Sequence, residues 1–306
     1  MSKLYYVIFF PFVLFLWKNR DSIRLSTPLQ SFIYANRDAK SSLTIDSTTF
    51  YVVNKNTKVT YPINYESTYP IIVSSLNKSI KDQNINSDIQ STLNIIKDST
   101  ATRLSKSYFK IEITKNTTTI TAPTDEGLHN GINSLNKLIM KNSGKLPLKV
   151  IEDYSALDNR ALHIVIRNDS ILKYYSWIDS ARYYNYNKII LRISNRIDLD
   201  AFSHFKSAKP RLSKQDFIKF VNYIKQSGFE IIPEIKLLTK QQFTFSDENN
   251  EFLYNKLTYD PRNDKVYQKV FPLIDEVIRS VPCNILHIGH DAVSYTHLTL
   301  PTKRIV

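Results

Sequence analysis

The chain of 306 residues has very little cysteine and little glycine. Its one cysteine, Cys283, excludes an internal disulfide and a metal site built from cysteine pairs. Only five glycines occur, so asparagine, which tolerates left-handed backbone better than most residues with a side chain, is expected to supply many turns. Each glycine that remains therefore marks a position where backbone geometry or close packing is expected to require it.

Acidic residues are also in deficit. The chain has 41 Lys and Arg against 28 Asp and Glu, a formal net charge of +13. Such an excess is compatible with a nucleic-acid or anionic-surface partner. The basic residues are scattered, however, and no predicted helix carries a Lys/Arg stripe interleaved with stacking aromatics. We therefore predict no nucleic-acid binding, and we interpret the charge as a well-solvated basic surface.

The first 25 residues are predicted to be a targeting segment. Lys3 precedes an apolar run from Leu4 to Trp17, and Lys18 and Arg20 follow it. A run of about 14 apolar residues is typical of a signal peptide and short for a membrane span of roughly 20. No small-x-small cleavage site follows, so a cleaved signal and a retained membrane anchor both remain open. Either one predicts an exported protein of the periplasm or cell envelope.

Residues 26–150 are predicted to form a small α+β domain. Segments 50–55 and 108–114 alternate like half-buried strands, and 118–122 resembles the return strand of a hairpin. The following segment is helical, because its apolar residues recur at spacings of three and four, and Thr124 is placed to cap its first turn. A polar, turn-rich stretch then sets the predicted domain boundary near Val150.

From residue 151 onward, strand and helix patterns alternate. Predicted strands at 161–167, 188–194, 229–235 and 284–291 are separated by helical segments, the last with a break or kink near Pro272. Repeated βα units predict a parallel sheet, and strands that end in polar residues suit a (β/α)8 barrel. A complete barrel needs about 250 residues. We therefore predict an α/β fold in which residues 151–292 form the first four βα units, half of a barrel.

Several ordered motifs resemble glycoside hydrolase family 20, the β-N-acetylhexosaminidases. They are TITAPTDEGLHNGINSLNKLI at the end of the α+β domain, DNRALHIVIR at the first barrel strand, WIDSARYYNYNKI, GFEIIPEI and LHIGHDA. The last matches the family's strand-four pattern His-Ile-Gly-(Gly or His)-Asp-Glu. The resemblance implies hydrolysis of terminal β-linked N-acetylhexosamine by a substrate-assisted retaining mechanism, with an amino-sugar glycan as partner and no cofactor or metal.

The resemblance implies site residues at four positions. Asp291 matches the catalytic Asp that polarises the sugar's acetamido group, whereas the proton-donating Glu that should follow is Ala292. Arg160 matches a sugar-binding arginine, with a structural ion pair as the alternative. Glu234 is a candidate substrate contact, with a buried ion pair at the strand ends as the alternative. His290 is a further substrate-binding candidate, although strand alternation turns it away from the face of Asp291.

Other interpretations remain open at this point. His287 should share the inward face with Asp291, and His163 is expected in the core or bottom layer. The family's usual strand-two and strand-three motifs are absent. That half of the predicted mouth is expected to be basic, which suits an anionic glycan, through Arg192, Asn195, Arg196 and Lys236. Residues 293–306 are interpreted as a non-native tail. The chain is expected to be inactive, because the proton donor and half of the pocket are missing. The alternatives are a non-catalytic glycan-binding or scaffold protein, and a barrel hydrolase of another family that uses Glu234 as acid or nucleophile.

Overall fold

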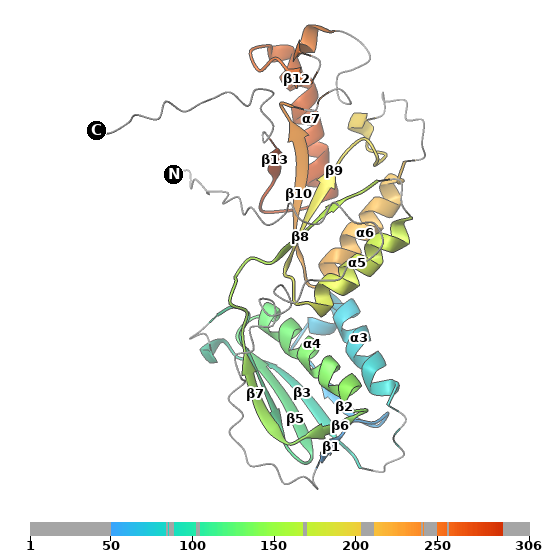
Figure 1. The fold of residues 1–306 in the computed structure, drawn as a ribbon, viewed down its shortest axis with the longest axis vertical. Helices are drawn as coiled ribbons and strands as arrows, with labels where there is room; N and C mark the ends of the chain where they lie inside the picture. The colour runs from blue at the N-terminus through green and yellow to red at the C-terminus, as the bar shows by residue number, and fades with distance from the viewer. Residues whose placement is uncertain are drawn as a thin grey trace, which may run out of the picture. The chain divides into compact units, whose positions relative to one another are not determined.

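The computed structural model describes residues 50–83, 85, 89–101, 105–167, 170–202, 211–239, 241, 250–255 and 257–289. These all lie in one compact unit, Ser41–Val306. The targeting segment, the predicted tail, His290 and Asp291 lie outside the described residues. The fold is mixed α/β, with a small α+β region followed by a parallel sheet (Figure 1). No helix in the described part of the chain has the length and apolar character needed to span a membrane.

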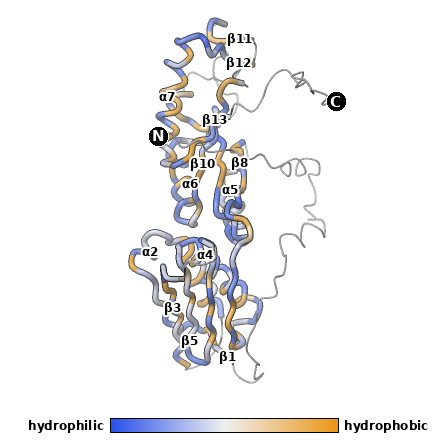
Figure 2. The backbone as a smooth tube through the Cα atoms, turned by 90° about the vertical axis from the view of Figure 1, so that its left-hand side faces the viewer, coloured by the Kyte–Doolittle hydropathy of each residue, from blue (hydrophilic) through white to orange (hydrophobic). Residues whose placement is uncertain are grey.

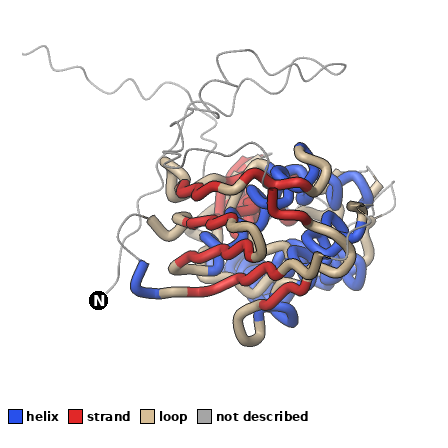
Figure 3. The backbone as a smooth tube through the Cα atoms, turned by 90° about the horizontal axis from the view of Figure 1, so that it is seen from below, coloured by secondary structure: helices blue, strands red, loops and turns tan. Residues whose placement is uncertain are grey.

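The α+β region is built on a five-stranded sheet of order β2-β3-β5-β4-β7. Its strands are β2 (Lys58–Thr60), β3 (Thr92–Lys97), β4 (Phe109–Ile113), β5 (Thr117–Ala122) and β7 (Lys149–Asp153). Figure 3 draws all strands in red. The predicted hairpin is confirmed, because β4 and β5 pair antiparallel. The predicted boundary near Val150 falls inside β7, which pairs with β4 and carries this sheet on to Asp153. A smaller sheet pairs β1 (Phe50–Val52) with β6 (Lys145–Pro147).

One face of this region's core is formed by α3 (Pro70–Lys81) and α4 (Asp125–Lys141), with the short α2 (Tyr65–Thr68) before them. The α4 cap is confirmed, since Thr124 Oγ1 accepts a hydrogen bond of 3.1 Å from the Gly127 backbone N–H. Gly127 allows α4 to approach the sheet, because a Cβ there would lie 2.2 Å from the Tyr108 carbonyl oxygen. Sequence analysis missed α3, although its buried residues follow helical spacing. They are Ile72, Val73, Leu76 and Ile80.

The parallel sheet has the order β13-β10-β9-β8. Its strands are β8 (Ala161–Val165), β9 (Lys188–Ile193), β10 (Glu230–Leu237) and β13 (His287–Gly289), connected through α5 (Ile171–Tyr183), α6 (Lys214–Gln226) and α7 (Asp264–Ser280). The four predicted strands and the three helices between them are thus confirmed in order, and the strands are parallel. Helix α7 runs without a break through Pro272, and hydrophobic and hydrophilic residues alternate along it (Figure 2). The remaining elements are η2 (Ser99–Ala101), η3 (Asp200–Phe202), η5 (Asn250–Phe252), β11 (Leu253–Asn255) and β12 (Thr258–Tyr259).

The helices bury one face of the parallel sheet. Alternate strand residues such as Ile164, Leu191 and Ile231 join a single core with Phe220 of α6 and Val277 of α7. Burial of this apolar surface is the main force that holds the helices on the sheet. Because strand side chains alternate between faces, the other set of residues must lie on the opposite face, where no helix of this core packs.

Candidate functional site

The opposite face of the parallel sheet carries a row of residues that the register defines. Val165 of β8 is paired with Arg192 of β9, Arg192 with Glu234 of β10, and Glu234 with His287 of β13. Residues of one row point to the same face, as do residues two positions away on each strand. His163 and Lys236 therefore share this face. The row lies in the carboxyl-terminal halves of β8, β9 and β10, the usual location of sites in parallel α/β folds.

Glu234 is the centre of an ionic group on this face, which we call the Glu234 cluster and define as Glu234, His163, Arg192 and Lys236. Its Oε2 accepts hydrogen bonds from His163 Nε2 at 2.5 Å and Arg192 Nε at 3.1 Å. Its Oε1 accepts from Arg192 Nη2 at 3.2 Å and Lys236 Nζ at 2.9 Å. The Glu234 side chain is only 3% exposed. Four donors therefore surround one buried carboxylate.

These donors determine the charge state of Glu234. Burial raises the pKa of the carboxyl group, but the hydrogen bonds from His163, Arg192 and Lys236 and the charge of His163 outweigh burial. The pKa of Glu234 is consequently held well below its ordinary value. A general acid near neutral pH needs a raised pKa instead. Glu234 is thus unsuited to proton donation, and the ion-pair interpretation of this residue fits its contacts.

The chain leaves β10 through a strained turn. Leu238 has φ 67, in the left-handed region that residues with side chains rarely adopt. Thr239 and Gln241, which follow, are buried, and the Gln241 side-chain amide donates to the Thr239 carbonyl oxygen at 2.9 Å. Local strain of this kind costs of order 1–3 kcal/mol and concentrates at functional sites. The turn lies at the carboxyl end of β10, two residues after Lys236.

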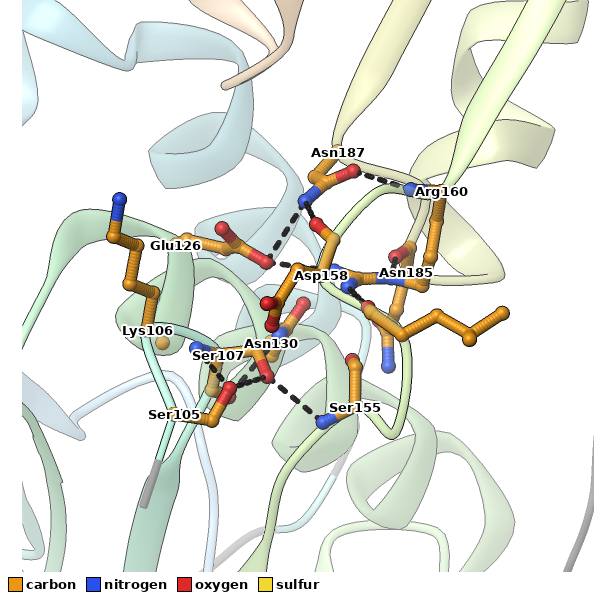
Figure 4. A network of polar contacts seen from close by, with 12 residues as sticks. Ser105, Lys106, Ser107, Glu126, Asn130, Ser155, Asp158, Arg160, Asn185 and Asn187 are labelled. Carbon is orange, nitrogen blue, oxygen red and sulfur yellow. Dashed lines mark hydrogen bonds and ion pairs between the residues drawn. The ribbon is translucent and has the colours of Figure 1, made fainter. Parts of the chain in front are cut away.

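Arg160 lies in a different network at the amino-terminal end of β8. Its Nη2 forms an ion pair of 2.7 Å with Glu126 Oε1 of α4, and its Nε donates to the Asn185 carbonyl oxygen at 2.6 Å. Asn187 donates to the same Glu126 oxygen at 3.1 Å and to the Asp158 carbonyl oxygen at 2.6 Å. Figure 4 shows these side chains converging from the α+β region and the parallel-sheet region. The guanidinium of Arg160 therefore joins the two regions.

Further contacts belong to the same junction. The Asn130 amide donates to the Ser107 carbonyl oxygen at 3.2 Å, and the Ser155 backbone N–H donates to Ser107 Oγ at 2.8 Å (Figure 4). Asn133 of α4 donates to the Arg182 carbonyl oxygen at 2.8 Å, at the end of α5. Sequence analysis did not identify these partners, because they come from segments far apart in the chain and no local pattern relates them.

The predicted site residues thus fall into separate places. The Arg160 backbone N–H donates to Asn187 Oδ1, one residue before β9 begins. Glu234 of β10 is instead the register partner of Arg192 in β9. Five residue steps along the strand separate Asn187 from Arg192 by about 17 Å, so the structure does not bring Arg160 and Glu234 together. His163, expected in the core or bottom layer, instead lies on the open face with a side chain 31% exposed. Asp291, Ala292 and His290 lie outside the described residues, and their roles stay predictions.

A metal does not fit what the described residues offer. Three positively charged or hydrogen-bond-donating side chains surround Glu234, and such donors repel a cation rather than bind it. No group of His, Cys, Asp and Glu with metal-binding geometry occurs among residues that the structure describes. The chemistry of the Glu234 cluster is therefore that of a preformed ionic surface.

Comparison with solved structures defines the class of fold. The chain superposes on a β-N-acetylhexosaminidase from Streptomyces coelicolor A3(2) with a TM-score of 0.65 and 16% identity, covering 83% of this chain and 58% of that one. For the chitobiase of Flavobacterium johnsoniae the TM-score is 0.62 and the identity 17%, over 81% and 43%. An exo-β-N-acetylglucosaminidase from Vibrio harveyi, solved with N-acetylglucosamine, gives 0.64 and 14%, over 82% and 45%. The chain has the fold of these enzymes and spans about half of their length.

A family model supports the same relationship in sequence. Residues 41–154 match the model described as glycosyl hydrolase family 20, domain 2. The resemblance to glycoside hydrolase family 20 is confirmed by this match together with the shared fold. The comparison with curated proteins gave no match.

Proposed function

We propose that this chain corresponds to the α+β domain and the first half of the (β/α)8 barrel of a family 20 β-N-acetylhexosaminidase-like protein. The strand order β13-β10-β9-β8, with a helix in each connection, supports the half-barrel. The open face of the sheet then corresponds to the barrel interior, where polar side chains at the carboxyl ends of the strands form the site.

The proposed ligand is a terminal β-linked N-acetylhexosamine. One of the structures with this fold contains N-acetylglucosamine, and the motifs of residues 285–292 resemble the strand that binds the acetamido group in the family. In this proposal Asp291 polarises the acetamido oxygen, and the Glu234 cluster forms the neighbouring wall of the pocket.

We further propose that the chain binds the sugar without cleaving it. Ala292, at the position of the family's proton donor, has no ionisable group. The observation that carries the proposal is the state of Glu234, whose pKa is held low by the donors around it, so it cannot replace that acid. The runner-up is a hydrolase with Glu after Asp291, and the residue that the intact gene encodes at position 292 distinguishes the two.

Two measurements on the full chain test this function. Incubation with a chromogenic β-N-acetylglucosaminide is expected to give no release of the chromophore, and clear turnover would contradict the non-catalytic assignment. Titration with N-acetylglucosamine is expected to give saturable binding that Asp291→Asn weakens and Asp260→Asn, on the surface turn before α7, leaves unchanged. Absence of saturable binding would refute the sugar-binding assignment.

Export stays part of the proposal. Residues 1–25 carry the charge and apolar pattern of a signal peptide or anchor. Fusion of these residues to a reporter that is active only outside the cytoplasm tests it. Reporter activity is expected, and its loss on replacing two apolar residues of the run with Asp would identify the run as the signal.

A further inference from the structure

We propose that His287 of β13 binds the sugar ligand by donating a hydrogen bond from its Nε2–H to a hydroxyl oxygen of the sugar. The inference rests on the proposed function and adds a specificity-determining residue to the same site. Three observations carry it: a fixed tautomer of the imidazole, its place on the open face of the parallel sheet, and a distortion of the pairing between β13 and β10.

The backbone fixes which nitrogen of His287 carries the hydrogen. The Gly289 backbone N–H donates a hydrogen bond of 3.1 Å to His287 Nδ1. A neutral imidazole has one donor nitrogen and one acceptor nitrogen, and the hydrogen bond at one of them sets the role of the other. Nδ1 is therefore the acceptor and Nε2 carries the hydrogen. The protein thus presents a neutral donor whose tautomer is already set.

His287 lies on the open face of the parallel sheet, beside the Glu234 cluster. Strand β13 is the edge strand next to β10 among the described strands (Figure 1), and His287 is the register partner of Glu234. Glu234 already accepts four hydrogen bonds from the other members of its cluster, and an ionised carboxylate has about four lone-pair sites. Glu234 therefore has no acceptor site left for His287.

The Nε2–H of His287 is left as a donor. Within the part of the chain that the structure describes, the hydrogen bond of this imidazole is the one that Nδ1 accepts. His287 is half-buried, and a donor that loses hydration without gaining a hydrogen bond costs free energy. A ligand oxygen at this place supplies the missing acceptor. A sugar hydroxyl suits this role, since its oxygen has two lone pairs.

The pairing between β13 and β10 is distorted next to His287. Between the pairs Glu234–His287 and Leu237–Gly289, two residues of β10 oppose one residue of β13, which is the arrangement of a β-bulge. Gly289 has φ 77, in the left-handed region, and a Cβ there would lie 3.1 Å from the Ile235 carbonyl oxygen. Bulges re-aim side chains and are frequent next to active sites. This one lies where the Gly289 N–H meets the imidazole.

The proposed function also places the carboxylate of Asp291 in this pocket. Asp291 lies four residues after His287, so at most about 14 Å separates their Cα atoms. An ionised carboxylate only accepts hydrogen bonds, whereas the Nε2–H only donates. The two side chains therefore serve different groups of one sugar, Asp291 the acetamido group and His287 a hydroxyl oxygen. A direct bond from Nε2 to Asp291 is the competing arrangement, which the experiments distinguish.

The first test uses the full chain labelled with ¹⁵N at its six histidines. NMR spectra of the imidazole nitrogens show which nitrogen of each ring is protonated. The signals of His287, assigned by their loss in His287→Gln, are expected to show hydrogen at Nε2 in the sugar-free chain. Addition of N-acetylglucosamine should shift them and leave those of His129, in α4, in place. Hydrogen at Nδ1, or no shift of His287 when the sugar binds, would overturn the inference.

A matched pair of variants separates the two nitrogens. The amide of His287→Asn reaches the position of Nδ1 and can accept from the Gly289 N–H. The amide of His287→Gln reaches the position of Nε2 and can donate to the sugar. Calorimetric titration with N-acetylglucosamine is expected to show an affinity loss of about tenfold for His287→Asn and a smaller loss for His287→Gln. The reverse order, or unchanged affinity in both, would contradict a ligand contact at Nε2.

The remaining outcomes separate the inference from the proposed function. If the unmodified chain binds no sugar, the proposed function fails and the inference fails with it. If His287→Asn binds the sugar as tightly as the unmodified chain, only the inference fails. If the His287 signals of the sugar-free chain change in Asp291→Asn, Nε2 donates to that carboxylate, and His287 positions Asp291 instead of contacting the sugar. Should circular dichroism show that His287→Asn is unfolded, the NMR titration of the unmodified chain decides.

Discussion

The two sheets of this protein each have a face away from their helices, and the two faces differ in how they carry charge. On the α+β sheet, Lys110 and Glu112 form an ion pair of 2.7 Å whose side chains are 34% and 43% exposed. On the parallel sheet, Glu234 is almost fully buried beneath three donors. Exposed ion pairs contribute little to folding stability and lose little hydration. Burying a carboxylate costs several kcal/mol of hydration free energy, which its hydrogen-bond partners must offset.

This difference bears on where the proposed site lies. The open face of the α+β sheet is an ordinary solvated surface, with Thr117, Thr119 and Thr121 alternating against the buried residues of β5. The open face of the parallel sheet concentrates desolvated charge at the strand ends. A sheet face that needed only to meet water would not require that cost, so the comparison supports the proposal that the site lies on the parallel sheet.

The largest expected effect on stability distinguishes the buried carboxylate of Glu234 from the exposed carboxylate of Glu112. Glu234→Gln removes the buried carboxylate that both Arg192 and Lys236 contact and is expected to lower the free energy of unfolding by about 3–5 kcal/mol. Glu112→Gln, which breaks the exposed pair, should lower it by less than about 1 kcal/mol. Urea unfolding of both variants measures the difference. Equal effects would remove the distinction between the two faces.

The pH dependence of stability should separate the same two regions. Burial lowers the pKa of His129 in α4 to about 4, so between about pH 6.5 and 4 the unfolded chain binds a proton that the folded chain does not. Stability should therefore fall as the pH drops through this range, by at most about 3.4 kcal/mol. Glu234 has a depressed pKa, so its contribution should be lost only below about pH 4.5.

Urea unfolding at a series of pH values tests this assignment with His129→Phe, which keeps an aromatic ring against Tyr69. Between pH 6.5 and 4 the free energy of unfolding should depend less on pH in the variant, whereas its fall below pH 4.5 should remain. If the variant showed the same pH dependence as the unmodified chain, other histidines would be responsible for the loss of stability between pH 6.5 and 4.

A third effect concerns the junction between the regions. Arg160→Gln removes the ion pair with Glu126 and the hydrogen bond to the Asn185 carbonyl oxygen. The expected loss is about 1.5–3 kcal/mol, the range for hydrogen bonds to charged groups. Arg262→Gln breaks an exposed pair with Asp260 and should change stability by less than about 0.5 kcal/mol. If Arg160→Gln instead weakened N-acetylglucosamine binding without loss of stability, Arg160 would be a sugar contact.

The smallest effect compares the two helix caps. Thr124 begins α4 and Ser213 begins α6, and each hydroxyl accepts a backbone N–H at 3.1 Å. Replacement of either by Ala should cost about 1 kcal/mol. Each hydroxyl also donates a second hydrogen bond, Thr124 Oγ1 to the Lys106 carbonyl oxygen of a distant segment and Ser213 Oγ to Asp216 Oδ2 in the same helical turn. Because only the first of these ties the helix to another segment, Thr124→Ala should cost more than Ser213→Ala. Thermal unfolding resolves the order, and the reverse order would show that the bond to Lys106 adds no stability.

Much of the local structure was predictable because the signals are local. The β4–β5 hairpin, the Thr124 and Ser213 caps and the left-handed Gly228 that ends α6 follow from alternation, capping chemistry and the freedom of glycine. Helix α3 was missed although its periodicity is present. Strand β3 was missed as well, and only its pairing with β2 and β5 makes it part of the sheet.

The sequence by itself determined the alternation of strands and helices from β8 to β13, their apolar faces and the resemblance to family 20, because each depends on neighbours a few residues apart. Only the tertiary structure decided the partners of the charged residues. It placed Glu126 against Arg160 and gathered His163, Arg192 and Lys236 around Glu234. The reason is physical: which charges meet depends on strand register and on how elements pack across the chain, and neither is encoded in any short window of residues.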